Sequence, residues 1–78
     1  MSARIDDRLD VARTILDALE REPARWTPLT RLALKHTTPW KAQAALEWLL
    51  RKGYVERPLR GVYEITERGT HLLRVLRP

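Results

Sequence analysis

The segment Ala42-Gln-Ala-Ala-Leu-Glu-Trp-Leu-Leu-Arg-Lys-Gly-Tyr-Val55 contains the change of periodicity that decides the fold. Its first apolar residues recur at the spacing of one helical face: Ala42, Ala45, Leu46 and Leu49. We therefore predict a helix over residues 39–52, with Thr38 as its cap, Pro39 as its first residue and Gly53 at its end. Beyond the glycine the period changes from 3.6 to 2, which is typical of a strand.

A β-hairpin is expected directly after this helix. Residues 54–57 and 61–65 alternate apolar and polar side chains, and the turn Pro58-Leu59-Arg60 separates them. Thr66 is placed to cap a last helix. Three leucines of that helix are expected to point inward: Leu72, Leu73 and Leu76.

An amphipathic helix is expected at the N-terminal end, over residues 5–21, with Ser2 as its cap and Pro23 after its last turn. Acidic and basic side chains fill its outer face. Its expected inward residues are Ile5, Leu9, Ala12, Ile15, Leu16 and Leu19.

A short strand and a second helix are expected between these two parts. The strand covers residues 24–27 and contains Trp26, which is expected in the core. Thr27 is expected to cap the second helix, with Pro28 as its first residue. The inward face of this helix comprises Leu29, Leu32, Ala33 and His36.

The elements predict an α+β, mainly helical fold with a three-helix core, a two-stranded hairpin with a short extra strand, and a C-terminal helix. The chain has 78 residues, 44% of them hydrophobic, so a single domain over residues 1–78 with a thin core is expected.

There is no cysteine, which excludes disulfides and thiolate metal sites. No apolar run approaches the ~18 residues of a membrane span, so a cytoplasmic protein without membrane contact is expected.

Positive charge is concentrated in the last two thirds of the chain. Residues 1–24 contain four basic and six acidic residues, whereas residues 25–78 contain eleven basic and four acidic ones, so the net charges are −2 and +7. This excess predicts a polyanionic partner. The absence of Asn and the single Gln fit a thermophilic source, but a GC-rich genome gives the same bias, and both explanations stay open.

Three strings carry a resemblance to a known family: Pro28-Leu-Thr-Arg-Leu-Ala33, the segment 42–55 quoted above, and Tyr63-Glu-Ile-Thr-Glu-Arg-Gly69. On these strings the chain resembles the winged helix-turn-helix family, in particular small bacterial and archaeal regulators of the MarR and PadR kind. The resemblance covers nearly the whole chain. It implies that the third helix, residues 39–52, enters the major groove of duplex DNA and that the wing, residues 54–65, lies on the backbone.

The resemblance places six residues in the groove: Thr38, Trp40, Lys41, Gln43, Ala44 and Glu47. Their chemistry suits base readout, because Gln pairs with adenine, Lys with guanine, Glu accepts from cytosine, and Trp or Ala contacts a thymine methyl. Five basic residues are expected to hold phosphates without regard to sequence: Arg25, Arg31, Lys35, Arg57 and Arg60. The short wing is expected to contact a phosphate without entering the minor groove, and the first helix is expected to face away from DNA.

The tryptophans of the third helix have a structural interpretation as well. Trp40, Ala44 and Trp48 form a stripe at spacing i, i+4, i+8, which suits packing against another subunit or the wing. Packing is the favoured interpretation for Trp48. For Trp40 both packing and DNA contact stay open.

No catalytic or metal site is predicted. His36 is expected to be a buried histidine or a helix cap, and His71 stands alone without acidic residues at metal-ligand spacing. There is no Ser-His-Asp order and no Gly-rich phosphate loop, so neither enzymatic activity, nor a cofactor, nor a small-molecule substrate is expected. Glu67 and Arg68 are interpreted as surface residues.

The sequence therefore predicts a sequence-specific transcriptional regulator that binds double-stranded DNA as a homodimer, associated with the nucleoid. The first helix, the last helix and the tryptophan stripe are all candidate dimer interfaces. Two alternatives stay open. One is a nucleoid coat protein that binds any duplex, and the other is a winged helix that serves as a protein-interaction module in a larger assembly.

Overall fold

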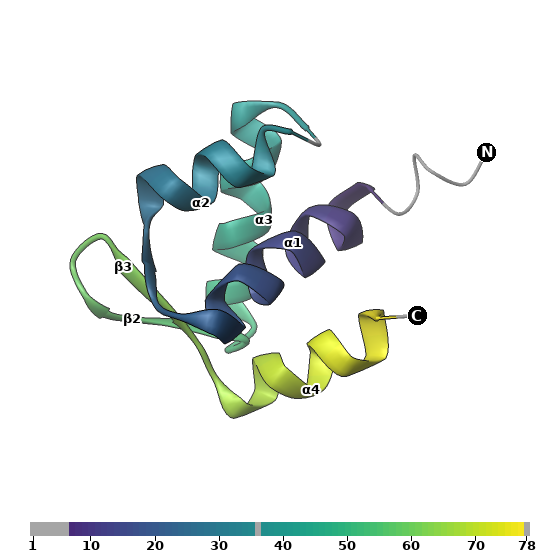
Figure 1. Ribbon diagram of the computed structural model, residues 1–78, viewed down its shortest axis with the longest axis vertical. Coiled ribbons are helices and arrows are strands. Elements are labelled where there is room, and N and C mark those ends of the chain that lie inside the picture. Colours follow the sequence, from purple (N-terminus) through teal and green to yellow (C-terminus); the bar gives the residue numbers. More distant parts are fainter. Residues whose placement is uncertain (1–6, 36, 78) are drawn as a thin grey trace.

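The computed structural model describes residues 7–35 and 37–77 (Figure 1). This part of the chain forms four helices and a three-stranded antiparallel sheet, in the order α1 Asp7–Arg21, β1 Ala24–Arg25, α2 Trp26–Ala33, α3 Pro39–Arg51, β2 Val55–Leu59, β3 Val62–Ile65 and α4 Glu67–Leu76. The predicted order of elements and the α+β, mainly helical class are confirmed. No helix in these described ranges has the length and apolar character that a membrane crossing requires.

Helix α1 lies in the middle of the molecule and packs against α2, α3, α4 and β3 (Figure 1). Ala12, Ile15, Leu16 and Leu19 are buried as predicted. The prediction for Leu9 was wrong, since its side chain is 38% exposed, whereas that of Val11 is 1% exposed. Val11 and Leu9 lie on opposite flanks of the apolar stripe, and Val11 is the one of the two that is buried. Ser2 and Ile5 lie outside the described residues.

Helix α2 begins earlier than predicted. Its N-cap is Arg25 and its first residue is Trp26, so the expected cap at Thr27 is wrong and Trp26 belongs to the helix rather than to the strand. The Trp26 N–H donates to the carbonyl of Gly61 at 3.1 Å, which satisfies one free donor of the helix terminus from the hairpin. Pro28 is then the third helical residue, still within the first turn, where a missing N–H leaves no helical bond unmade. The Trp26 side chain is half-buried against the core.

Helix α3 follows the prediction closely. Its inward residues are all at most 2% exposed: Ala42, Ala45, Leu46 and Leu49. Thr38 is the N-cap residue and Pro39 opens the helix, although the Thr38 side chain makes no capping hydrogen bond. Gly53 follows the last turn at φ 80°, and the N–H groups of Gly53 and Tyr54 donate to the carbonyls of Leu50 and Leu49. These two bonds form a Schellman motif, which ends the helix.

The turn of the hairpin lies later in the chain than the predicted turn at residues 58–60. Leu59 pairs with Val62, so Arg60 and Gly61 form the turn, and Pro58 lies within β2. The pairing slips between Glu56 and Leu59, and this bulge accommodates Pro58, which has no N–H to donate to the ladder. Gly61 has φ 78°, a left-handed conformation that favours glycine at the turn. The sheet order is β1-β3-β2.

A compact junction joins the end of α3, the hairpin and α4. The Thr66 hydroxyl accepts from the Gly69 N–H at 3.0 Å, which confirms the predicted cap, and it donates to the Gly53 carbonyl at 2.7 Å. The Thr66 N–H donates to the Tyr54 carbonyl at 3.1 Å. Gly69 packs directly on the backbone of Tyr54, just before β2, because a Cβ there would overlap the Tyr54 carbonyl oxygen and lie 2.8 Å from Cγ1 of Ile65.

The first prediction concerns this junction. Gly69→Ala should lower the free energy of unfolding by about 2 kcal/mol or more, because the added methyl group meets backbone that cannot rotate away. Urea unfolding followed by circular dichroism measures the loss. Gly53→Ala is the matched control: it strains a left-handed backbone, but its Cβ would make only an ordinary contact with Cδ of Arg68 at 3.9 Å, and it should cost about 1 kcal/mol. A smaller loss at Gly69 than at Gly53 would contradict the proposed close contact.

Candidate nucleic-acid interface

The predicted groove residues lie together on the outward side of α3 or at its start. All six are exposed: Thr38, Trp40, Lys41, Gln43, Ala44 and Glu47. Trp40 is the most prominent, with 69% of its surface exposed, and the Lys41 ammonium lies 6.0 Å from its ring centroid. At this distance the ammonium is within range of a cation–π contact. The outward face of α3 thus presents an aromatic ring, a cation, an amide and a carboxylate.

A shallow hollow of about 300 Å³ separates α3 from the hairpin. Its lining comes from α2, α3, β2 and β3: Trp26, Gln43, Leu46, Glu47, Leu50, Arg57 and Tyr63. The floor is apolar and aromatic, whereas the rim is polar. On the rim, the Gln43 amide Nε2 donates to Oε2 of Glu47 at 3.3 Å. The hollow therefore brings one predicted phosphate ligand, Arg57, next to two predicted base-reading residues.

Arg25 does not join this group. In the sheet Arg25 pairs with Val62, while Ala24 pairs with Tyr63. Since successive residues of a strand point to opposite faces, Arg25 lies on the sheet face away from Tyr63 and the hollow. The structure therefore places these two predicted phosphate ligands, Arg25 and Arg57, on different faces of the sheet.

Several basic residues of β1, α2, the end of α3 and the hairpin lack acidic partners among the described residues. Arg31 and Lys35 are exposed at the end of α2, and Arg60 is exposed in the hairpin turn. From β1 to the hairpin, the exposed basic side chains that form no ion pair with another described residue are Arg25, Arg31, Lys35, Arg51, Lys52, Arg57 and Arg60. Their charge is therefore available to an external anion.

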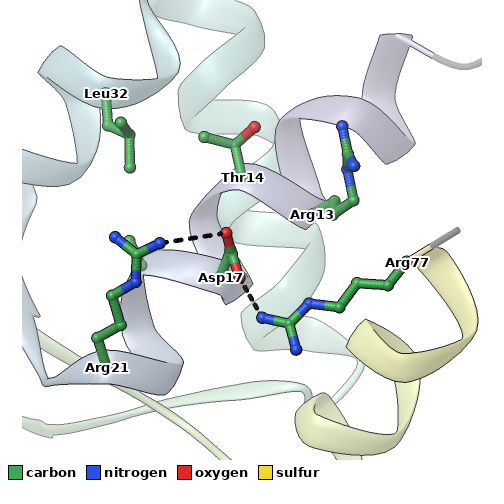
Figure 2. A pocket seen from close by; sticks show the side chains of 7 residues that line it. Arg13, Thr14, Asp17, Arg21, Leu32 and Arg77 are labelled. Atoms are coloured by element: carbon green, nitrogen blue, oxygen red, sulfur yellow. Dashed lines mark hydrogen bonds and ion pairs between the residues drawn. The ribbon is translucent and has the colours of Figure 1, made fainter.

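On α1, Arg13 and Arg21 are paired instead. Arg13 lies 3.9 Å from Asp10, Arg21 lies 3.8 Å from Asp17, and Arg77 binds both Asp17 and Glu20, with 2.8 Å to the Glu20 carboxylate. Figure 2 shows Asp17 between Arg21 and Arg77, in a second hollow of about 310 Å³. The carboxylates neutralise the guanidinium groups here. The contacts of Arg77 hold the C-terminal segment against α1, and this hollow does not present free positive charge.

The Arg77 contact also changes the titration of Asp17. The hydrogen bond from Arg77 holds the pKa of the Asp17 carboxyl below its ordinary value of 3.8, and the charges of Arg77, Arg21 and Arg13 act in the same direction. Partial burial opposes them. The ionised carboxylate is thus favoured in the folded state.

Sequence reasoning did not single out three basic residues near the hairpin. Arg51 and Lys52 are exposed at the end of α3, and Arg51 continues the outward stripe of Trp40. Arg68 was interpreted as a surface residue, but its guanidinium lies 5.2 Å from the Tyr54 ring centroid. The charge of Arg51 and its helical phase were readable from the sequence. The position of Arg68 over Tyr54 depends on how α4 packs.

The other aromatic and histidine predictions have mixed outcomes. Trp48 is half-buried, with its ring centroid 5.5 Å from that of Tyr54, so the packing interpretation is confirmed for Trp48. His36 lies outside the described residues, and His71 is exposed on α4. No group of metal-ligating side chains occurs among the residues that the structure describes.

Comparison of the chain with protein-family models, with curated proteins and with solved structures finds no match.

The second prediction follows from the lowered pKa of Asp17. Because the folded pKa lies below the unfolded one, the Arg77 contact stabilises the fold fully above about pH 5, and this stabilisation is lost as the pH falls through the lowered pKa. Asp17→Asn should lower the Tm by no more than about 5 °C at pH 7, since the pair is exposed. At pH 2 the difference from the original protein should be smaller, because the carboxyl group becomes protonated as the pH falls.

Thermal unfolding at the two pH values measures this effect. Asp10→Asn is the control, because among the described residues Asp10 pairs only with Arg13 on its own helix, at 3.9 Å, and the substitution should change the Tm little at either pH. An equal effect of Asp17→Asn at pH 7 and pH 2 would contradict the role of the ionised carboxylate.

Proposed function

We propose that the protein binds double-stranded DNA as a winged helix-turn-helix domain, with α3 in the major groove and the β2–β3 hairpin on the adjacent backbone. Bound as a homodimer, it would act as a transcriptional regulator. The observation that carries the proposal is the division of the basic residues. In α2, at the end of α3 and in the hairpin, exposed basic residues lack acidic partners within the described chain (Arg31, Arg51, Arg57 and Arg60), whereas Arg13 and Arg21 of α1 are paired.

The shape of the molecule supports the same function. The major groove of B-DNA is about 12 Å wide and admits an α-helix. Helix α3 has 13 residues and an outward face with hydrogen-bonding side chains, and its inward face is anchored on α1. The hairpin projects beside α3 in Figure 1, where it would meet the backbone next to a groove-bound helix.

The size of α3 supports the homodimer. One helix end offers few base contacts, whereas a two-fold pair doubles them on half-sites about 34 Å apart.

A regulator of this kind should prefer its site over random DNA by about 10³-fold or more. A nucleoid coat protein would show no such preference, and a protein-interaction module would bind DNA weakly with little salt dependence. Competition with random DNA and a salt titration separate the three functions.

The third prediction tests the phosphate contacts of the hairpin. The double substitution Arg57→Ala and Arg60→Ala should weaken binding to all duplexes alike, because phosphate contacts carry no sequence information. It should also reduce the slope of log affinity against log salt by about 1.8, since each neutralised phosphate contributes about 0.9. Fluorescence anisotropy with a labelled duplex at several salt concentrations measures both effects.

Arg21→Ala serves as the matched control for this experiment. Arg21 is also an exposed arginine, but it pairs with Asp17 on α1, outside the proposed interface. Its loss should leave the salt slope unchanged. A slope near zero for the original protein, or an equal reduction in both variants, would contradict the proposed function.

The fourth prediction concerns Trp40. Trp40→Ala should weaken duplex binding at least fivefold, on the order of one lost base contact, and should leave the folding stability within about 0.5 kcal/mol, because the ring is exposed. Trp40→Phe keeps an aromatic ring and should retain most of the binding. Gel shifts measure binding, and analytical ultracentrifugation measures the mass of the assembly. A fall from dimer to monomer would assign Trp40 to a subunit interface instead.

A further inference from the structure

Glu47 is an exception on the proposed DNA-binding face. It is the single acidic residue of α3, in the sequence Pro39-Trp-Lys-Ala-Gln-Ala-Ala-Leu-Glu-Trp-Leu-Leu-Arg51, and its side chain is exposed. A carboxylate close to DNA phosphates is repelled by them and lowers the affinity for any duplex. Base edges differ from phosphates in this respect, because exocyclic amino groups donate hydrogen bonds that a carboxylate accepts.

Gln43 holds the carboxylate in place. Its Nε2 donates to Oε2 of Glu47 at 3.3 Å, one helical turn away. This contact uses one of the two amide N–H groups, so Gln43 still has one N–H and its Oε1 for another partner. One donor and one acceptor are the groups with which Gln pairs bidentately with adenine. The acceptor capacity of Oε1 on Glu47 also remains.

Glu47 and Arg57 line the same hollow without pairing. No ion pair joins these two described side chains. Leu46 and Leu50 contribute apolar surface to the hollow. Arg57, on β2, is therefore left for a phosphate of the strand that passes the hairpin, whereas Glu47, on α3, is left for a base edge.

We propose that Glu47, positioned by Gln43, is the specificity-determining residue of this interface: it accepts a hydrogen bond from the amino group of a cytosine, while Gln43 pairs with an adenine in the adjacent base pair. The inference rests on the proposed duplex binding. Glu47 acts in two ways. It raises the affinity for a site with an amino group at this position, and it lowers the affinity for a register that places a phosphate there. The recognised site thus contains a base step with one adenine and one cytosine.

The experiment starts with selection of duplexes from a random pool by the original protein. The affinity for the selected duplex and for a shuffled one is then measured by fluorescence anisotropy. Glu47→Gln should raise the affinity for the shuffled duplex and should lower the ratio of the two affinities about tenfold, with the loss confined to the cytosine position. Gln43→Ala should relax both the adenine and the cytosine positions, because Glu47 then loses its orienting donor.

Glu56→Gln is the matched control. Glu56 is an exposed carboxylate of β2 that pairs with Glu64 across the hairpin, so the substitution removes the same charge without touching the hollow. It should leave the ratio of affinities unchanged. Thermal unfolding of each variant confirms that the fold is kept, since a surface pair at i, i+4 contributes little stability.

The outcomes separate this inference from the proposed function. If the original protein prefers its selected duplex and Glu47→Gln keeps the full preference, the role of Glu47 is overturned while duplex binding stands. Equal affinity of the original protein for selected and shuffled duplexes also overturns it, and leaves a general DNA-binding protein. The absence of binding to any duplex overturns both proposals.

Discussion

The backbone bonds around Tyr54 place the hairpin relative to α3, and the rest of the interface depends on them. The Tyr54 N–H completes the end of α3 by donating to Leu49, and the Tyr54 carbonyl accepts from Thr66 at the start of α4. Gly69 allows α4 to approach this carbonyl directly. A short segment is thus held from both sides by main-chain groups, which cannot move as side chains do. The distance between Arg57 on β2 and Glu47 on α3 follows from this junction.

The distribution of charge gives the fold two different faces. On α1, acidic residues lie three or four positions from Arg13 and Arg21 and pair with them, and the C-terminal Arg77 joins the same network. The elements after α1 contain too few acidic residues for such pairing, so their guanidinium and ammonium groups remain exposed. A net charge of +5 for the whole chain therefore underestimates the positive charge that a partner of α3 and the hairpin would meet.

Local patterns predicted several features correctly. The buried face of α3, the glycine that ends it and the Thr66 cap each depend on residues within a few positions of one another, so periodicity and capping rules suffice. The start of α2 and the turn of the hairpin were predicted wrongly. Trp26 begins α2 because its N–H meets the carbonyl of Gly61, which lies 35 positions later in the chain. A bulge at Pro58 moved the turn to Arg60 and Gly61.

The sequence by itself determined which residues of α3 face outward and where the basic residues are concentrated, because helical phase and charge are properties of neighbouring positions. Only the tertiary structure decided which of these residues meet. It placed Arg57 beside Gln43 and Glu47, it placed Arg25 on the opposite face of the sheet, and it brought Arg68 onto the Tyr54 ring. These arrangements follow from strand register and from the packing of α4. Both depend on contacts between residues far apart in the chain, which no local pattern encodes.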